Sequence, residues 1–214
     1  MKAASPWPRL RRDIVAILRG VAPAEVEAVA AALAEAGFEA VEVPLNSPDP
    51  FDSIERLSRL LGTEVVVGAG TVLDPEDVDR LCDAGGRLMV SPNVDEAVLR
   101  RAVGRGLVTL PGVFTATEAL SALRFGASAL KVFPASALGP AGLAAIRAVL
   151  PEGTVMGAVG GVSEADFAAY AAAGFRCFGL GSSLYKPGDA PEAVAAKARA
   201  AVAAYDAVFG GQPS

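Results

Sequence analysis

The sequence predicts a single (β/α)8 barrel, the TIM barrel fold, with an additional segment at its N-terminus. Hydrophobic residues make up 52% of the 214 residues, which is typical of a heavily buried protein. The chain also has eight short apolar runs, and seven of them follow the same pattern: a helix rich in Ala and Leu, then a glycine, then the apolar run. Crossover helices between parallel strands account for this alternation, and eight such units close into a barrel more readily than they form an open sheet. A doubly wound sheet is the alternative.

Glycines mark the junctions between the expected helices and strands. The repeat is clearest in "AEAGFEAVEVPL", "VGRGLVTLPGV" and "RFGASALKVFP". A glycine at the C-terminal end of a helix before a strand is expected of such connections. The junction glycines are Gly37, Gly85, Gly106, Gly126 and Gly174, with two less obvious junctions near Gly62 and Gly153.

These junctions predict eight strands and eight helices in strict alternation. The expected strands are residues 14–18, 40–45, 64–69, 88–91, 107–111, 129–133, 154–159 and 177–180. The helices are expected to begin near Pro23, Pro50, Pro75, Asp95, Thr115, Pro140, Ser163 and Pro191, residue types that helix N-termini prefer. No linker divides the chain, so we expect one domain over residues 1–214, with residues 1–12 and 210–214 as peripheral tails.

Composition restricts the partners. A net charge of −5 and an aromatic content of 6% give no reason to expect binding to nucleic acid or to an anionic membrane. No apolar run approaches the ~18–20 residues of a membrane span, and the N-terminus does not read as a secretory signal. Cys82 and Cys177 lie far apart in sequence, and core packing is their expected role. We therefore expect a reduced, cytoplasmic protein.

The chain contains no histidine, which restricts the chemistry further. Ser–His and Cys–His nucleophile pairs, His-ligated zinc and imidazole general bases are all excluded. Lysine is scarce as well, since the chain has only Lys2, Lys131, Lys186 and Lys197. A lysine within an apolar strand is therefore a marked exception.

Lys131 is that exception, in the stretch "SALKVFP". Side chains alternate along a strand, so Lys131 and Phe133 would point into the barrel while Leu130 and Val132 face the helices. Glu42 would point into the same barrel from its own strand, and Arg19 would reach the same end. Burial of either charge alone costs several kcal/mol, so pairing, hydrogen bonding or neutralisation is required.

Two interpretations follow for these residues. Lys131 and Glu42 could form a structural ion pair. Alternatively, Lys131 could be a Schiff-base nucleophile, since desolvation lowers the pKa of a buried amine toward neutrality. A nearby carboxylate favours the ammonium form, and the sequence does not decide which effect is larger. In the second interpretation Glu42 is the general acid and base.

Two glycine-containing turns predict a phosphate site. Gly160 and Gly161 follow the seventh expected strand in "AVGGVSEAD", and Gly181 and Ser182 follow the eighth in "GLGSSLY". Glycines let backbone N–H groups approach an anion, and the loops after the last two strands are the usual phosphate site of this fold.

Other polar residues at strand ends keep two interpretations. Asn46 and Ser47 could contact a substrate or build the turn "NSPDP". Thr71 could bind a carboxylate or hydroxyl group, or belong to the start of the next helix with Asp74. Asn93 could contact a ligand or cap the fourth helix.

Taken together, these stretches resemble a known family. The segments "AILRG", "AVEVPLNSP", "GAGTVL", "VSPN", "TATEAL", "GASALKVFPAS", "AVGGV" and "GLGSSLY" occur in the order found in class I aldolases that cleave 2-keto-3-deoxy-6-phospho sugar acids. The similarity extends over residues 14–185. Within this group "VEVPLNSP" and Val159 resemble the 2-dehydro-3-deoxy-6-phosphogalactonate type, because the phosphogluconate type usually has Thr-Leu-Arg and Thr at these places.

The resemblance implies a role for each predicted site residue. Lys131 matches the Schiff-base lysine and Glu42 the acid–base carboxylate. Arg19 and Thr71 match residues that engage the substrate carboxylate. The phosphate-binding loops correspond to Gly160, Gly161, Gly181 and Ser182. The implied reaction cleaves a phosphorylated keto-deoxy sugar acid to pyruvate and D-glyceraldehyde 3-phosphate, with no metal or cofactor, in a homotrimer.

Three alternatives stay open. The phosphogluconate-type aldolase performs the same chemistry on the opposite C4 configuration. A metal-dependent phosphosugar epimerase shares the barrel, but such enzymes generally need His and Asp ligands. A non-catalytic barrel that binds phosphorylated ligands would keep Lys131 as an unreactive ammonium, and the fold alone does not exclude it.

Overall fold

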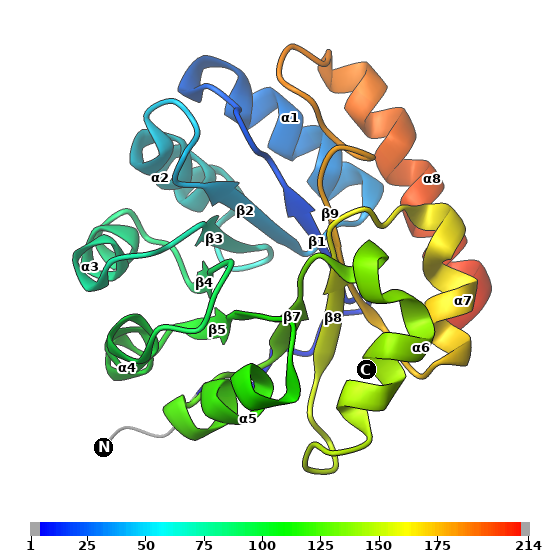
Figure 1. The fold of residues 1–214 in the computed structure, drawn as a ribbon. Coiled ribbons are helices and arrows are strands. Elements are labelled where there is room, and N and C mark those ends of the chain that lie inside the picture. The colour runs from blue at the N-terminus through cyan, green and yellow to red at the C-terminus, as the bar shows by residue number, and fades with distance from the viewer. Residues whose placement is uncertain (1–4, 211–214) are drawn as a thin grey trace.

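The computed structural model describes residues 5–210 as a ring of helices around a barrel of parallel strands (Figure 1). The strands are β1 (Ile14–Ile17), β2 (Ala40–Pro44), β3 (Val66–Gly70), β4 (Leu88–Val90), β5 (Val108–Leu110), β6 (Gly112–Val113), β7 (Leu130–Val132), β8 (Met156–Val159) and β9 (Cys177–Leu180). The helices are α1 (Pro23–Ala36), α2 (Pro50–Leu61), α3 (Pro75–Asp83), α4 (Glu96–Arg105), α5 (Ala116–Phe125), α6 (Ala135–Arg147), α7 (Phe167–Ala172) and α8 (Pro191–Phe209). None of these helices is long and apolar enough to cross a membrane.

The barrel has eight strands because β5 and β6 are two halves of its fifth strand, separated by Pro111. β5 pairs with β4 and β6 pairs with β7, both in parallel. The Lys131 N–H donates to the Pro111 carbonyl at 2.9 Å, and the Ala129 N–H donates to Thr109 at 3.1 Å, so hydrogen bonds continue across the junction. The predicted (β/α)8 barrel is confirmed, and the doubly wound sheet is not formed.

One helix begins earlier than predicted. α6 starts at Ala135, five residues before the expected start near Pro140. Gly139 adopts a non-helical conformation with φ 65° and ψ 175°, and Pro140 then begins a second helical segment. Proline at the first position of a helix is what the sequence signalled, so the missed part is the short turn directly after β7.

Two separate cores confirm the predicted alternation of side chains along the strands. The inner core fills the barrel, and the outer core lies between the strands and the helices. Inner residues include Val15, Leu88, Val90, Leu110 and Ala129, whereas outer residues include Val41, Val43, Leu130 and Val132. Because Val41, Val43, Leu130 and Val132 face outward, Glu42 and Lys131 must face the barrel interior.

The described part of the N-terminal segment differs from the expected peripheral tail. Leu10 is buried and packs with Val15 and Leu88 in the inner core. The Trp7 indole donates to Asp13 at 3.0 Å, and the Ser128 hydroxyl donates to the Ser5 carbonyl at 2.6 Å. Residues 5–12 thus cover the barrel end opposite the carboxyl ends of the strands. Their packing shields the apolar side chains of the barrel interior from water at that end. Residues 1–4 and 211–214 lie outside the described part of the chain.

The two cysteines are free thiols. Cys177 is buried inside the barrel, where its Sγ would lie 2.9 Å from a Cβ added to Gly157. Cys82 is half-buried on α3 and packs against the outer core. Both positions agree with the expected packing role.

Candidate active site

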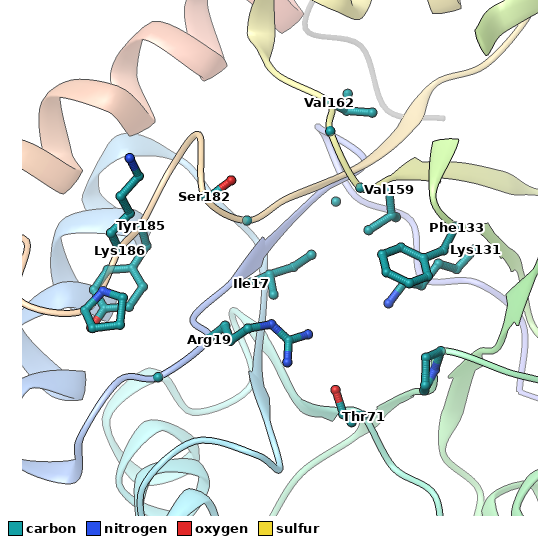
Figure 2. Close-up of a pocket in the computed structure, with 17 residues that line it drawn as sticks. Ile17, Arg19, Thr71, Lys131, Phe133, Val159, Val162, Ser182, Tyr185 and Lys186 are labelled. Carbon is teal, nitrogen blue, oxygen red and sulfur yellow. The ribbon is translucent and has the colours of Figure 1, made fainter. Parts of the chain in front are cut away.

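A pocket of about 720 Å³ opens at the carboxyl ends of the strands. It collects residues from both halves of the chain (Figure 2). Seven of the eight residues predicted from the sequence line it, namely Arg19, Thr71, Lys131, Gly160, Gly161, Gly181 and Ser182. The eighth, Glu42, lines a smaller cavity inside the barrel that also touches Lys131. All eight predicted residues therefore lie close together at the carboxyl ends of the strands.

The pocket is cationic although the protein is acidic. Arg19, Lys131 and Lys186 line it, and none of its lining residues is a carboxylate. In Figure 2 the Arg19 guanidinium and the Lys131 amine project into the same space from opposite sides, while the Lys186 side chain points away from both. A small anionic molecule fits this distribution of charge.

Lys131 is held in β7 with a side chain that is only 5% exposed. Its Nζ lies 4.9 Å from the centroid of the Phe133 ring. Desolvation lowers the pKa of the Lys131 amine, Glu42 opposes this shift, and Arg19 adds to it. The direction favours the neutral amine, which is the nucleophilic form.

Glu42 is the most buried carboxylate near this site, at 2% exposure. Burial raises its pKa from 4.5 to about 7, although the charges of Lys131 and Arg19 oppose the shift. Among the described residues, its Oε2 atom has no hydrogen-bond partner. A carboxyl group with a pKa near neutrality can both accept and return a proton at physiological pH.

Lys131 and Glu42 do not form a direct ion pair. None of the ion pairs within residues 5–210 joins them. A cavity of about 10 Å³ is lined by both side chains together with Val15, Leu110 and Val159. This volume is close to the ~10–15 Å³ that one water needs. The structural ion pair, one of the two interpretations of the sequence, is therefore not found.

Asn46 and Ser47 brace the loop that carries Arg19. The Arg19 Nη1 donates to Asn46 Oδ1 at 2.6 Å, and the Gly20 N–H donates to Ser47 Oγ at 2.9 Å. Neither residue is among those that line the pocket. The β2–α2 loop thus fixes the β1–α1 loop. Asn46 and Ser47 therefore hold the loop of a predicted substrate-binding residue, a role that neither interpretation of the sequence included.

Thr71 lies at the pocket in a strained conformation. It follows β3 directly and has φ 57°, in the left-handed region that a β-branched residue rarely adopts. Such strain is commonly associated with functional sites. Asp74 precedes α3 but makes no capping hydrogen bond through its side chain.

Asn93 does not cap α4, and it is not among the residues that line the pocket. Asp95 caps α4 by accepting a hydrogen bond from the Val98 N–H at 3.0 Å. The Asn93 carbonyl instead accepts a hydrogen bond from the Ser91 hydroxyl at 2.7 Å. The suggestion that Asn93 caps the fourth helix is wrong, because the helix begins two residues later than that cap would require.

The two glycine turns border one side of the pocket. Gly160 and Gly161 have φ values of 90° and 70°, so this turn needs glycine at both positions. A Cβ on Gly160 would lie 2.9 Å from the Phe133 ring, and one on Gly161 would lie 2.5 Å from Ser136 Oγ. Gly181 and Ser182 line the pocket at the neighbouring end of β9, and Figure 2 shows Ser182 there. This placement agrees with the predicted phosphate site.

Sequence reasoning did not single out Gly70 or Lys186. Gly70 lies against the Glu42 carboxylate, where an added Cβ would be 1.9 Å from Oε2. The signal was available, because Gly68 and Gly70 are two residues apart in β3 and so share its inner face. Lys186 is one of only four lysines and lies four residues after Ser182 of the second glycine turn.

The raised pKa of Glu42 predicts a pH-dependent gain in stability for Glu42→Gln. The unfolded chain loses this proton near pH 4.5, whereas the folded protein keeps it up to about pH 7. The wild-type protein therefore loses stability as pH rises through this window. We expect the advantage of the variant in free energy of unfolding to grow by about 2 kcal/mol between about pH 5 and pH 8. Urea unfolding at both pH values measures it, with Glu192→Gln on exposed α8 as control. An advantage of equal size at both pH values would contradict the shift.

Comparisons with known proteins agree with this site. Residues 9–195 match the family described as "KDPG and KHG aldolase". The chain is 60% identical over 207 residues to a "Probable 2-dehydro-3-deoxy-6-phosphogalactonate aldolase" of Rhizobium meliloti (strain 1021), covering 97% of this chain and 98% of the relative. The solved "Native KDPGal structure" superposes with a TM-score of 0.93 at 46% identity, covering 96% of this chain and 99% of that one.

A more distant solved structure carries information about chemistry. It is a KDPG aldolase from Legionella pneumophila "with pyruvate captured at low pH as a covalent carbinolamine intermediate". It has a TM-score of 0.78 and 26% identity, and covers 92% of this chain and 94% of that one. With the family matched over most of its length, the chain belongs to the KDPG and KHG aldolases, a family of class I aldolases.

Proposed function

We propose that this protein cleaves 2-dehydro-3-deoxy-6-phosphogalactonate to pyruvate and D-glyceraldehyde 3-phosphate through an imine on Lys131. The observation that carries the proposal is a buried, unpaired lysine at the base of a cationic pocket, with a carboxyl group of near-neutral pKa beside it. The substrate is supported by the two similar proteins described above, the probable 2-dehydro-3-deoxy-6-phosphogalactonate aldolase at 60% identity and the KDPGal structure at 46% identity.

The first half of the reaction builds an electron sink. The neutral Lys131 amine adds to the C2 ketone of the substrate. The protonated Glu42 carboxyl group then gives its proton to the carbinolamine hydroxyl, which leaves as water, so that a protonated imine and a Glu42 carboxylate remain. Glu42 then takes the proton of the C4 hydroxyl group, and the water-sized cavity beside its carboxylate provides room for transfer through one water. As the C4 oxygen becomes a carbonyl, the electrons of the C3–C4 bond move to the imine nitrogen. An enamine of pyruvate remains on Lys131, and the phosphorylated aldehyde leaves.

The second half returns the enzyme to its starting state. Glu42, now protonated, gives its proton back to C3 of the enamine and regenerates the imine. Water then adds at C2, hydrolysis releases pyruvate and the neutral Lys131 amine, and the Glu42 carboxylate takes up the proton that this hydrolysis sets free. A carboxyl group with a pKa of about 7 suits this double role, because neither protonation state is strongly favoured at neutral pH.

The remaining predicted residues hold the two charged ends of the substrate. Arg19 and Thr71 lie across the pocket from Lys131 and would bind the C1 carboxylate, with Asn46 fixing the guanidinium (Figure 2). The turns at Gly160–Gly161 and Gly181–Ser182 would bind the phosphate through backbone N–H groups and the Ser182 hydroxyl. An anion at each end leaves the C2 ketone near Lys131.

Borohydride trapping tests the imine. Wild-type protein incubated with pyruvate and borohydride is expected to carry one reduced pyruvyl adduct, on the peptide with Lys131. Lys131→Ala should lose the adduct and lower cleavage by about 1,000-fold or more while keeping the fold, because the nucleophile is gone. Peptide mass mapping, steady-state kinetics and circular dichroism measure these outcomes.

A second lysine of the same pocket provides the matched control for trapping. Lys186→Ala should still form the adduct, since its side chain points away from the site between Arg19 and Lys131. If the folded wild-type protein forms no adduct, the imine mechanism is wrong and a non-catalytic barrel that binds phosphorylated ligands becomes the better account.

Kinetics on the two C4 epimers test the substrate. We expect kcat/KM to be higher, by about tenfold or more, for 2-dehydro-3-deoxy-6-phosphogalactonate than for the phosphogluconate epimer. A hydroxyl orientation contributes at most a few kcal/mol of discrimination, so measurable turnover of both is expected. The opposite preference would identify the protein as the phosphogluconate type.

The homotrimer and the cytoplasmic location are parts of this proposal. A trimer is supported by apolar side chains that are exposed in the single chain, namely Leu73, Phe114 and Leu120. Light scattering coupled to size exclusion should give the mass of three chains of 21.6 kDa. A mass of one chain at micromolar concentration would refute the assembly. The cytoplasmic location rests on the composition of the sequence alone.

A further inference from the structure

Gly70 occupies a position inside the barrel that no role yet explains. It ends β3, next to β2, and the Glu42 carboxylate lies directly over its Cα. A Cβ at this position would lie 1.9 Å from Oε2, 2.5 Å from Cδ and 2.6 Å from Oε1 of Glu42. All three carboxyl atoms would thus overlap with the methyl group of an alanine. The Glu42 carboxylate therefore has its present place only because residue 70 has no side chain.

The neighbouring space shows where a displaced carboxylate would go. On the side of the barrel axis, Glu42 borders the cavity of about 10 Å³ that Lys131 also lines. The other walls of this cavity are apolar side chains and the backbone of Gly179. A side chain pushed off β3 would enter this cavity and approach the Lys131 amine.

We propose that Gly70 is a positioning residue that keeps the Glu42 carboxylate against β3 and out of direct contact with Lys131. The cavity that both side chains line is close to the size of one water, and no ion pair joins the two groups. A direct ion pair would hold Lys131 as an ammonium and would remove the nucleophile. This inference rests on the proposed function of Lys131 as the imine-forming residue.

The energetics agree with this geometry. Desolvation lowers the pKa of Lys131, and Glu42 opposes that shift from its present distance. The pKa of an amine in direct contact with an opposite charge is about 1–3 units higher than the pKa of the same amine without that charge. Because desolvation and attraction act in opposite directions, a move of Glu42 toward Lys131 would shift the balance toward the ammonium form.

The test is the pH dependence of imine trapping in Gly70→Ala. We expect its profile for pyruvate and borohydride to move toward alkaline pH by about one unit, so that trapping at pH 7 falls about tenfold relative to wild type. At high pH the two proteins should converge, because Lys131 is then neutral in both. A merely structural role for Gly70 would instead lower trapping by the same factor at every pH.

Two further variants separate the proposed cause from others. In Glu42→Gln, the additional change Gly70→Ala should leave the trapping profile where it was, because no carboxylate remains to pair with Lys131. Gly104→Ala is the control for the loss of a glycine, since a Cβ there meets nothing within 4 Å. An unshifted profile in Gly70→Ala, or a shift that persists beside Gln at position 42, would overturn the inference.

A size exchange keeps the proposal testable if Gly70→Ala does not fold. The double variant Gly70→Ala with Glu42→Asp shortens the acid by one methylene and makes room for the new methyl group. We expect it to recover soluble, folded protein that Gly70→Ala alone does not give, and failure to do so would refute the steric contact.

Absence of any adduct in wild-type protein would contradict the proposed function itself, whereas a wild-type adduct with an unshifted variant profile would contradict only the role of Gly70.

Discussion

The separation between Lys131 and Glu42 is the constraint on which the rest of the site depends. Both are nearly completely buried, and each alone would be costly to hold in its charged form. A direct ion pair would relieve that cost, yet none is formed. The pKa of each group moves instead toward neutrality, up for the acid and down for the amine. Without the ion pair the folded state is less stable, but Lys131 can act as a nucleophile and Glu42 as a proton carrier at neutral pH.

The barrel makes this arrangement possible because it fixes both backbones and restricts both side chains. Glu42 is on β2 and Lys131 on β7, on opposite sides of the barrel. Apolar side chains such as Val15, Val90 and Leu110 fill the interior beneath them and exclude bulk water. The N-terminal segment closes the far end with Leu10. Small residues then decide the remaining space, since Gly70 gives the carboxylate its place and Gly179 opens one wall of the central cavity.

The loops at the carboxyl ends of the strands complete the same site. The β2–α2 loop holds Arg19 and Gly20 through Asn46 and Ser47, and Thr71 stays in a strained conformation at the pocket. The turns after β8 and β9 border the opposite side. A substrate with a carboxylate at one end and a phosphate at the other would match this spacing of cationic and glycine-rich elements. The acidic surface and the cationic pocket of one protein are therefore compatible, because local charge and not net charge governs binding.

Local sequence patterns were enough to predict the barrel, the inward direction of Lys131 and Glu42, and the set of residues that meet at the strand ends. Strand alternation and eight helix–strand repeats carry that information locally, because side-chain direction has a period of two and the barrel places all strand ends together. The resemblance to aldolases of phosphorylated keto-deoxy sugar acids, read from the order of the motifs, agrees with the comparisons. Helix boundaries were less certain, as the early start of α6 at Ala135 demonstrates.

The contacts that these residues make across the barrel could not be predicted in this way. Whether Lys131 touches Glu42, what Asn46 binds, and which groups lie over Gly70 all depend on distances between strands that are far apart in sequence. The packing of residues 5–12 under the barrel could not be predicted either. A short segment of mixed polar and apolar residues has the same sequence pattern whether it packs against the barrel or stays exposed. Local patterns fix the direction of a side chain, but desolvation and charge depend on every neighbour within several ångströms, and those neighbours are known only once the chain has closed.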